Sequence, residues 1–322
     1  MTITLTRSVP HGPGAAKDTV RSRVTCAFVN NMPDGAFDAT ERQYLGLLEA
    51  ASGSDVIELR RFTLPGVPRD ERTAARIREE YLPFAELYDL TPDFLIVTGS
   101  NPIETHLRDE PYWDDLVALV RWSKESVPTT LLSCLAAHAA LTVFDGIERV
   151  RLPGKCTGVF AHVVDVRHPL ATGIEPAILL PHSRINGTPE EAVHEAGYEI
   201  VAHSETASWA IASRGDDRHR LILVQGHPEY DPSSLLREYR RDAGRYVHHE
   251  RNDLPFLPFH CAAPEDWMTL EAIHHEIING QRDPRLLDSF PFDDAGARAP
   301  WPWRPMAQQF YTNVLAGVLS AS

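Results

Sequence analysis

The chain has 322 residues, of which 43% are hydrophobic and 24% charged, a composition typical of a globular protein with one large core or two small ones. Its formal net charge of −14 argues against a general binder of nucleic acid or of anionic membranes. The sequence has neither an apolar run of about 18 residues nor the apolar core of a secretory signal, so we expect no membrane span and a cytoplasmic location.

The cysteines and histidines predict neither a disulfide framework nor a metal site. The four cysteines are widely scattered, which fits a reducing compartment: Cys26, Cys134, Cys156 and Cys261. The 15 histidines include two adjacent pairs, but neighbouring residues on a helix point to different faces and no other ligand stands at metal-binding spacing. We therefore expect no metal and no permanently bound cofactor.

The first half of the chain alternates buried-strand patterns with helical ones. Residues 1–22, rich in proline and glycine, are expected to form a flexible arm. Strands are predicted at residues 23–30, 55–64, 94–99 and 130–132, and helices at residues 37–51, 70–90 and 113–124. Strands that alternate with helices predict a parallel, doubly wound sheet of an α/β fold.

The second half is richer in strands. Strands are predicted at residues 159–166, 177–180, 199–203, 209–213 and 220–225, several of them as antiparallel additions to the sheet. Residues 233–247 are expected to form a helix, and residues 255–305 an irregular segment with one helix near 267–279. The order predicts one catalytic α/β domain at residues 23–250, with residues 251–322 packed on it as a C-terminal extension.

A cysteine lies at the most informative point of the sequence. The apolar run that ends at Leu132 predicts a short buried strand, and Ser133-Cys134 follow directly before a helix-favouring segment. A cysteine on such a turn lies near the free N–H groups of the helix, which favour a thiolate and can bind a developing oxyanion. Taken alone, Cys134 is equally well interpreted as a buried, inert thiol.

A second strand end supplies the partners that a nucleophilic thiol needs. The apolar run before Gln225 predicts a strand, and Gly226-His227-Pro228-Glu229 follow it. A thiolate nucleophile needs a base, and the base needs an orienting group. Sites in open α/β sheets form at the carboxyl ends of strands, so we expect Cys134, His227 and Glu229 to lie together.

With these residues in place, the chain resembles the homoserine O-acyltransferase family, in its cysteine-dependent branch of homoserine O-succinyltransferases. The resemblance covers roughly residues 23–250 and returns at residues 303–319. It is carried by Asn31-Met32-Pro33, Thr98-Gly99, Tyr112-Trp113, Trp122-Ser123-Lys124, Cys134, Ala139-Ala140-Leu141, Gly146-Ile147, Lys155, Gly158-Val159, Pro181-His182-Ser183-Arg184, the segment from Gly226 to Asp231, and Arg241-Asp242. The resemblance implies a flavodoxin-like, class I glutamine-amidotransferase-like fold.

The resemblance also implies a ping-pong acyl transfer with an acyl-CoA as co-substrate and a hydroxy amino acid as acceptor. Cys134 would carry the acyl group, His227 would act as general base and Glu229 would orient it. Substrate contacts are implied for Lys155, Ser183, Arg184 and Arg241, and a homodimer is common in the family. The spacing of Arg237, Arg241 and Arg245 indicates instead a helix face that is exposed to solvent. A substrate contact of Arg241 is compatible with this pattern only if that helix face lines the cleft.

Three departures from the family bear on the substrate. Asp34-Gly35 stand where the family has a lysine pair, so a cationic contact is lost or comes from elsewhere. In the family, one position distinguishes the members that transfer a succinyl group from those that transfer an acetyl group. This position holds Ile103, with Glu104 next to it, and both residues favour acetyl over succinyl. His138 follows Cys134 by one helical turn and is interpreted as a packing or surface histidine in preference to a second polar group near the thiol. The segment 256–300 matches no part of the family and is expected to cover the cleft or contact a partner subunit.

The sequence is also compatible with other activities. Serine or another hydroxy amino acid is an alternative acceptor. A glutamine-amidotransferase-type hydrolase shares the fold and the Cys–His–Glu set, but Asn31-Met32-Pro33 and Pro181-His182-Ser183-Arg184 favour the acyltransferase. A non-enzymatic sensor that has kept the fold would form no acyl-enzyme.

Overall fold

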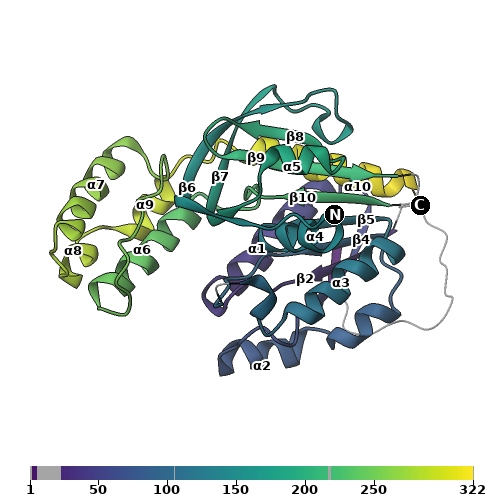
Figure 1. The fold of residues 1–322 in the computed structure, drawn as a ribbon, viewed down its shortest axis with the longest axis horizontal. Coiled ribbons are helices and arrows are strands. Elements are labelled where there is room, and N and C mark those ends of the chain that lie inside the picture. The colour runs from purple at the N-terminus through teal and green to yellow at the C-terminus, as the bar shows by residue number, and fades with distance from the viewer. Residues whose placement is uncertain (1, 6–22, 105, 217–218, 322) are drawn as a thin grey trace.

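A single mixed sheet organises the molecule (Figure 1). The computed structural model describes residues 2–5, 23–104, 106–216 and 219–321. Within them the sheet has ten strands in the order β1-β3-β2-β4-β5-β10-β9-β8-β6-β7. The strands are β1 (Thr2–Leu5), β2 (Arg23–Val29), β3 (Val56–Phe62), β4 (Phe94–Val97), β5 (Thr129–Ser133), β6 (Val150–Val164), β7 (Ala177–Gly187), β8 (Glu199–Ser204), β9 (Ser208–Gly215) and β10 (Arg220–Val224).

The strands from β1 to β10 in that order are parallel, and the strands from β9 to β7 are antiparallel. The succession β3-β2-β4-β5-β10 is the flavodoxin-like order, in which the second strand along the chain lies outside the first. The predicted α/β fold with a doubly wound, mostly parallel sheet is confirmed, and so are the antiparallel additions in the second half.

Helices cover both faces of the sheet because its central strands are apolar on both sides. In β4, Phe94 and Ile96 belong to one core cluster, and Leu95 and Val97 belong to the other. The first cluster includes side chains of α1 (Asp34–Ala51), α6 (Ser234–Val247) and α10 (Arg304–Ala321). The second includes side chains of α3 (Trp113–Ser126), α4 (Leu135–Asp145) and α5 (Glu190–Glu195).

The N-terminal arm is the first point at which the structure differs from the sequence-based prediction. Residues 2–5 form β1, which pairs in parallel with β3 at the edge of the sheet. β-Branched Thr2, Ile3 and Thr4 favour an extended backbone, and Ile3 packs against the core. Four residues are too short for a periodicity to be recognised. The rest of the predicted arm, residues 6–22, lies outside the described part of the chain.

Proline marks most of the other differences. The helix predicted at residues 70–90 ends as α2 (Glu71–Glu80), and after Pro83 a 3-10 turn follows at Phe84–Asp89. The segment predicted as irregular contains three helices, α7 (Pro264–Ile278), α8 (Pro284–Asp288) and α9 (Phe292–Arg298). Two of them begin with proline at their first turn, a helix-start signal. These helices group with α6 at the left end of Figure 1. None of the described helices is long and apolar enough to cross a membrane.

Candidate active site

Cys134 occupies a strained turn between β5 and α4. Its backbone has φ 50° and ψ −109°, a conformation that residues other than glycine rarely adopt, and α4 begins at the next residue. The Cys134 N–H donates to the carbonyl oxygen of Val224 at 2.7 Å, which ties the turn to the end of β10. Gly99 follows β4 on the other side, and a Cβ there would lie 3.3 Å from the Cβ of Cys134. The thiol is therefore half-buried at the carboxyl edge of three parallel strands.

His227 and Glu229 lie at the same edge because Val224 of β10 is the register partner of Ser133 in β5. The Nδ1 atom of His227 lies 2.8 Å from Oε1 of Glu229, and both side chains are buried. Burial lowers the pKa of His227, but the Glu229 carboxylate and hydrogen bonds with Cys134 and Glu229 outweigh it and raise that pKa well above its usual value. The structure thus brings the predicted thiol, base and carboxylate together.

Tyr230 fixes the His227 ring, a role for which the sequence carries no separate signal. The two rings are stacked with centroids 4.3 Å apart and planes 18° apart. The carbonyl oxygen of Tyr230 accepts hydrogen bonds from the indole N–H groups of Trp301 at 3.0 Å and Trp303 at 2.9 Å. Residues about 70 positions further along the chain thereby hold the residue that packs on the imidazole.

Three of the four predicted substrate-contacting residues meet at two carboxylates of α6. Lys155 lies 3.1 Å from Asp242 and 3.6 Å from Glu238. Ser183 donates to Glu238, and Arg241 pairs with Asp242 at 2.8 Å. Glu238 and Asp242 therefore face β6 and β7, whereas Arg241 lies beside them with 43% of its side chain exposed, on the solvated face that its spacing with Arg237 and Arg245 indicates. Glu238 also accepts from the Tyr230 hydroxyl at 2.6 Å, and the sequence prediction missed it.

Arg184, the fourth of these residues, is a buried cation next to two thiols. Its guanidinium donates to the carbonyl oxygens of Asn186 and Ala207. Burial lowers the pKa of Arg184, while the charges of Cys156 and Cys134 act in the opposite direction. Burial also raises the pKa of Cys156, against which Arg184 and His227 act. Cys156 is thus a second thiol close to the site that the sequence did not single out.

The loop expected to select the acyl group lies at the surface. The side chain of Ile103 is 67% exposed, and Glu104 donates its backbone N–H to Oε1 of Glu110 at 2.7 Å. Ile103 therefore does not narrow an enclosed pocket. Arg149 stands near this loop: burial lowers its pKa, and the charges of Glu110 and Cys134 oppose that effect. Arg149 is a further cation near the thiol that sequence reasoning missed.

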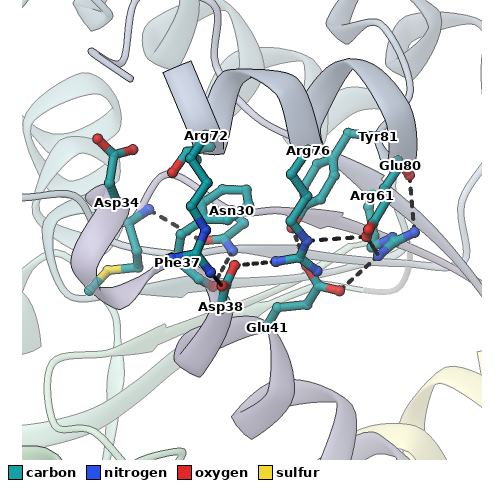
Figure 2. A network of polar contacts seen from close by, with 12 residues as sticks. Asn30, Asp34, Phe37, Asp38, Glu41, Arg61, Arg72, Arg76, Glu80 and Tyr81 are labelled. Carbon is teal, nitrogen blue, oxygen red and sulfur yellow. Dashed lines mark hydrogen bonds and ion pairs between the residues drawn. The ribbon is translucent and has the colours of Figure 1, made fainter. Parts of the chain in front are cut away.

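Asp34, which stands where the resemblance implies a lysine pair, connects the start of α1 to the loop before α2. Its Oδ2 accepts the backbone N–H of Asp70 at 2.8 Å, and Arg69 lies 3.7 Å from its Oδ1. Arg69 also donates to the carbonyl oxygens of Met32 and of Asn30, the latter at 3.2 Å. The loop after β2 is therefore held by an arginine from the loop before α2. Figure 2 shows Asn30 and Asp34 of this region beside the charged groups of α1 and α2.

His138 is a packing residue, as the sequence favoured. It is 2% exposed, and its Nε2 lies 2.9 Å from Oε1 of the buried Gln225. Burial lowers the pKa of His138 to about 4, although the hydrogen bond to Gln225 acts in the opposite direction. It is therefore a neutral core group and not a second acid or base beside the thiol.

A cavity of about 660 Å³ adjoins the substrate-contacting residues. Lys155 and Cys156 line it together with apolar side chains of β6 and β7 and with Phe259 from the segment before α7. Phe259 forms a parallel bridge to Gly158, where a Cβ would lie 2.5 Å from the Phe259 nitrogen. Among the described residues, no three His, Cys, Asp or Glu side chains gather as a metal-binding group.

The fold and the site together define a class: an α/β protein of flavodoxin-like strand order with a Cys–His–Glu group at the carboxyl edge of its parallel strands. Comparison with known proteins narrows this class. The family described as homoserine O-succinyltransferase matches residues 10–320, and the chain belongs to that family.

The chain is similar to individual members and to solved structures. It is 41% identical to the homoserine O-succinyltransferase of Rhodopseudomonas palustris over 83% of this chain and 80% of that protein. It is 40% identical to that of Bradyrhizobium japonicum over 87% and 85%. The crystal structure of SMU.1228c aligns over 91% of this chain and 99% of that one, with 15% identity and a TM-score of 0.52, a likeness of fold alone.

Proposed function

We propose that the protein is a homoserine O-acyltransferase that carries the acyl group from acyl-CoA on Cys134 as a thioester. One observation carries the proposal: a thiol on a strained strand-to-helix turn lies beside a buried His227–Glu229 pair. The names of the relatives, homoserine O-succinyltransferases, supply the acceptor and the reaction class.

The reaction follows from the order of the three groups. His227 takes the thiol proton, and the Cys134 sulfur attacks the acyl-CoA carbonyl. The collapse of the tetrahedral intermediate breaks the bond to the CoA sulfur, which leaves with the proton. His227 then takes the proton of the homoserine hydroxyl, whose oxygen attacks the acyl-thioester and releases Cys134. Glu229 keeps the imidazole oriented and stabilises its charged form in both halves.

The acceptor is an amino acid, and the site offers both charges that it needs. Arg241 would hold the carboxylate, as the resemblance implies, and Glu238 and Asp242 would face the ammonium group. Lys155 keeps these two carboxylates from repelling each other, because it lies within 4 Å of both. Ser183 connects this group to β7 through its hydrogen bond to Glu238.

The acyl group that we propose is succinyl. The relatives carry succinyl in their names. The expectation of acetyl depended on Ile103 reducing the room for a second carboxylate, and the exposed Ile103 gives it no support. Arg149 and Arg184 add positive charge on the side of the thiol, which suits a dicarboxylic acyl group.

A matrix of acetyl-, succinyl- and propionyl-CoA against homoserine and serine tests donor and acceptor together. We expect CoA release with succinyl-CoA that depends on homoserine, and a succinyl adduct in intact-mass spectrometry without acceptor. Cys134→Ala should lose the adduct, and Cys156→Ala, which removes the neighbouring thiol, should keep it. No adduct with any acyl-CoA, or ammonia release from glutamine, would contradict the proposal.

We also propose a homodimer through the β6–β7 edge. β7 is the last strand in the order of the sheet, and this pair carries exposed apolar side chains, among them Val163, Leu179 and Ile185. Light scattering should give about twice the 36.0 kDa chain mass for the native protein. Val163→Glu should give the mass of one chain, and a native protein of single-chain mass would overturn this assignment.

A further inference from the structure

The carboxylate of Glu238 on α6 is held from three other segments of the chain. Its Oε1 accepts from the hydroxyl of Tyr230, in the loop after β10, at 2.6 Å. Its Oε2 accepts from Ser183 of β7 and lies 3.6 Å from Nζ of Lys155 of β6. Both oxygens thus have partners, and these contacts fix the direction in which the carboxylate points. A carboxylate fixed in this way can in turn hold one of its partners in place.

Tyr230 is the partner whose freedom depends on Glu238. The carbonyl oxygen of Tyr230 is fixed by the indole N–H groups of Trp301 and Trp303, so its backbone has little room to move. The hydroxyl contact with Glu238 then limits the rotation of the side chain. Burial raises the pKa of Tyr230 well above its usual value, and the charges of Glu238 and Glu229 raise it further. The hydroxyl therefore keeps its proton and remains a donor.

The other end of this connection is the imidazole of His227. Its Nδ1 is 2.8 Å from Glu229, so Nε2 is the nitrogen that serves Cys134. A single contact at Nδ1 leaves the imidazole free to turn about the line that joins the two atoms. The Tyr230 ring removes this freedom, because it is stacked on the imidazole with centroids 4.3 Å apart and planes 18° apart. The position of the Tyr230 ring therefore sets the plane of the imidazole.

We propose that Glu238 is a positioning residue for His227 and acts on it through Tyr230. Glu238 holds the Tyr230 hydroxyl, and the Tyr230 ring holds the imidazole in the plane in which it activates the thiol of Cys134. No proton is transferred along this connection. The carboxylate that would face the ammonium group of the acceptor thus also sets the reactivity of the thiol before the acceptor binds. The inference rests on the proposed thiol chemistry but not on the identity of the acyl donor or acceptor.

The test measures the reactivity of Cys134, which needs no substrate. The rate of iodoacetamide alkylation at Cys134 is followed by peptide mass spectrometry against pH for the native protein and for Tyr230→Phe, which keeps the ring and removes only the hydroxyl. An imidazole that is no longer held in its plane stabilises the thiolate less, so we expect the midpoint of the pH profile to move to higher pH. The rate at neutral pH should fall about tenfold, the effect of one lost hydrogen bond to a charged group.

Two variants of Glu238 separate its hydrogen bond from its charge. Glu238→Ala and Glu238→Gln both remove the negative charge, but glutamine keeps an oxygen that accepts from the Tyr230 hydroxyl. Loss of the charge by itself favours the thiolate and moves the midpoint to lower pH in both variants. The midpoint of Glu238→Ala should therefore lie above that of Glu238→Gln, because only alanine releases Tyr230.

Tyr198→Phe is the matched control. Tyr198 is buried and its hydroxyl donates to Oδ2 of Asp145 at 2.9 Å, the same kind of contact in the core cluster on the other face of the sheet. Its midpoint should equal that of the native protein. Circular dichroism confirms folding, and Tyr230→Phe or the pair of Glu238 variants decides the question alone if the other fails to fold. An unchanged or lower midpoint in Tyr230→Phe, or equal midpoints in the two Glu238 variants, overturns the positioning role even when the acyl-transfer assay supports the proposed reaction.

Discussion

The absence of a side chain at Gly99 gives Cys134 its room. An added Cβ would lie 3.3 Å from the Cβ of Cys134 and 3.4 Å from the backbone nitrogen of Leu135. Both atoms belong to the strained turn, which the hydrogen bond of Cys134 to Val224 also holds, so neither can yield without moving the sulfur. The space beside the Cys134 thiol is thus fixed by backbone atoms, and no flexible side chain can move to widen it.

We therefore predict that Gly99→Ala slows acylation of Cys134 by about tenfold, equivalent to about 1.4 kcal/mol in the barrier. Overpacking of this size costs about 1–3 kcal/mol elsewhere in proteins. The measurement is the single-turnover rate of adduct formation with succinyl-CoA. Gly35→Ala is the control, because no atom lies within 4 Å of the added Cβ and its position is helical. A Gly99→Ala rate equal to that of Gly35→Ala would contradict the prediction.

Local patterns predicted the residues at strand ends and missed those that support them. Cys134 and the His227–Glu229 pair each follow an apolar run, and parallel register brings such ends together. Tyr230 carries no separate signal, because stacking on an imidazole leaves no period in the sequence. Trp301 reaches Tyr230 across 71 positions, and no local rule relates residues so far apart.

At the scale of elements, charged groups join α1 to α2 beside the loop that follows β2 (Figure 2). Glu41 of α1 is buried and lies at the centre of this network. It accepts from Arg61 at 2.8 Å and from Arg76 at 3.0 Å, and the Tyr81 hydroxyl also donates to it. The Glu41 carboxylate balances the positive charges of Arg61 and Arg76, and the Arg61 side chain is only 12% exposed. Removal of the Glu41 charge therefore weakens more than one contact of the network.

We predict that Glu41→Gln lowers the free energy of unfolding by about 3 kcal/mol, the usual cost of removing one partner of a buried ion pair. Urea unfolding at pH 7 measures the change. Glu71→Gln is the control on the neighbouring helix, where Glu71 and Arg78 are largely exposed, and we expect less than about 1 kcal/mol there. Equal losses in the two variants would show that burial does not set the strength of the Glu41 contacts.

At the scale of the whole molecule, the sequence predicted the parallel half of the sheet best. Apolar runs such as Phe94–Val97 form strands that are buried on both faces. A continuous apolar run predicts such a strand almost regardless of which strands lie beside it in the sheet. β1 was not predicted, because this edge strand of four residues is stabilised by its pairing with β3, which lies far along the chain. The position of α10 was not predicted either, since a helix pattern gives a buried face but not the helix on which it packs.

Three buried histidines make the whole fold sensitive to acid. Burial lowers the pKa of His138 and of His162 to about 4, and that of His182 well below its usual value. His162 donates from Nδ1 to the Phe160 carbonyl oxygen at 3.0 Å, so its Nε2 accepts from Nε2 of His182 at 3.0 Å. Both rings are therefore neutral. In the described part of the chain Nδ1 of His182 has no hydrogen-bond partner, so a proton added there would find no acceptor.

The sign of the pH dependence follows from these shifts. Between pH 6.5, where an unfolded histidine titrates, and about pH 4, the unfolded chain binds protons that the folded chain does not. The stability that these groups contribute is complete above pH 6.5 and falls by about 1.4 kcal/mol per pH unit for each histidine as the solution becomes more acid. His227, whose pKa is raised, gains no protons relative to the unfolded chain below pH 6.5 and does not oppose the loss.

We predict that urea unfolding at pH 7.5, 6 and 5 shows a steep loss of stability below pH 6.5, and that His138→Gln reduces this slope. Glutamine offers an amide N–H to Gln225 in place of the imidazole and does not titrate, so the variant lacks the proton-binding difference that His138 contributes. His194→Gln removes an exposed histidine, and its slope should match that of the native protein. If His138→Gln and the native protein lose stability in parallel, the acid sensitivity arises from carboxylates and not from the buried imidazoles.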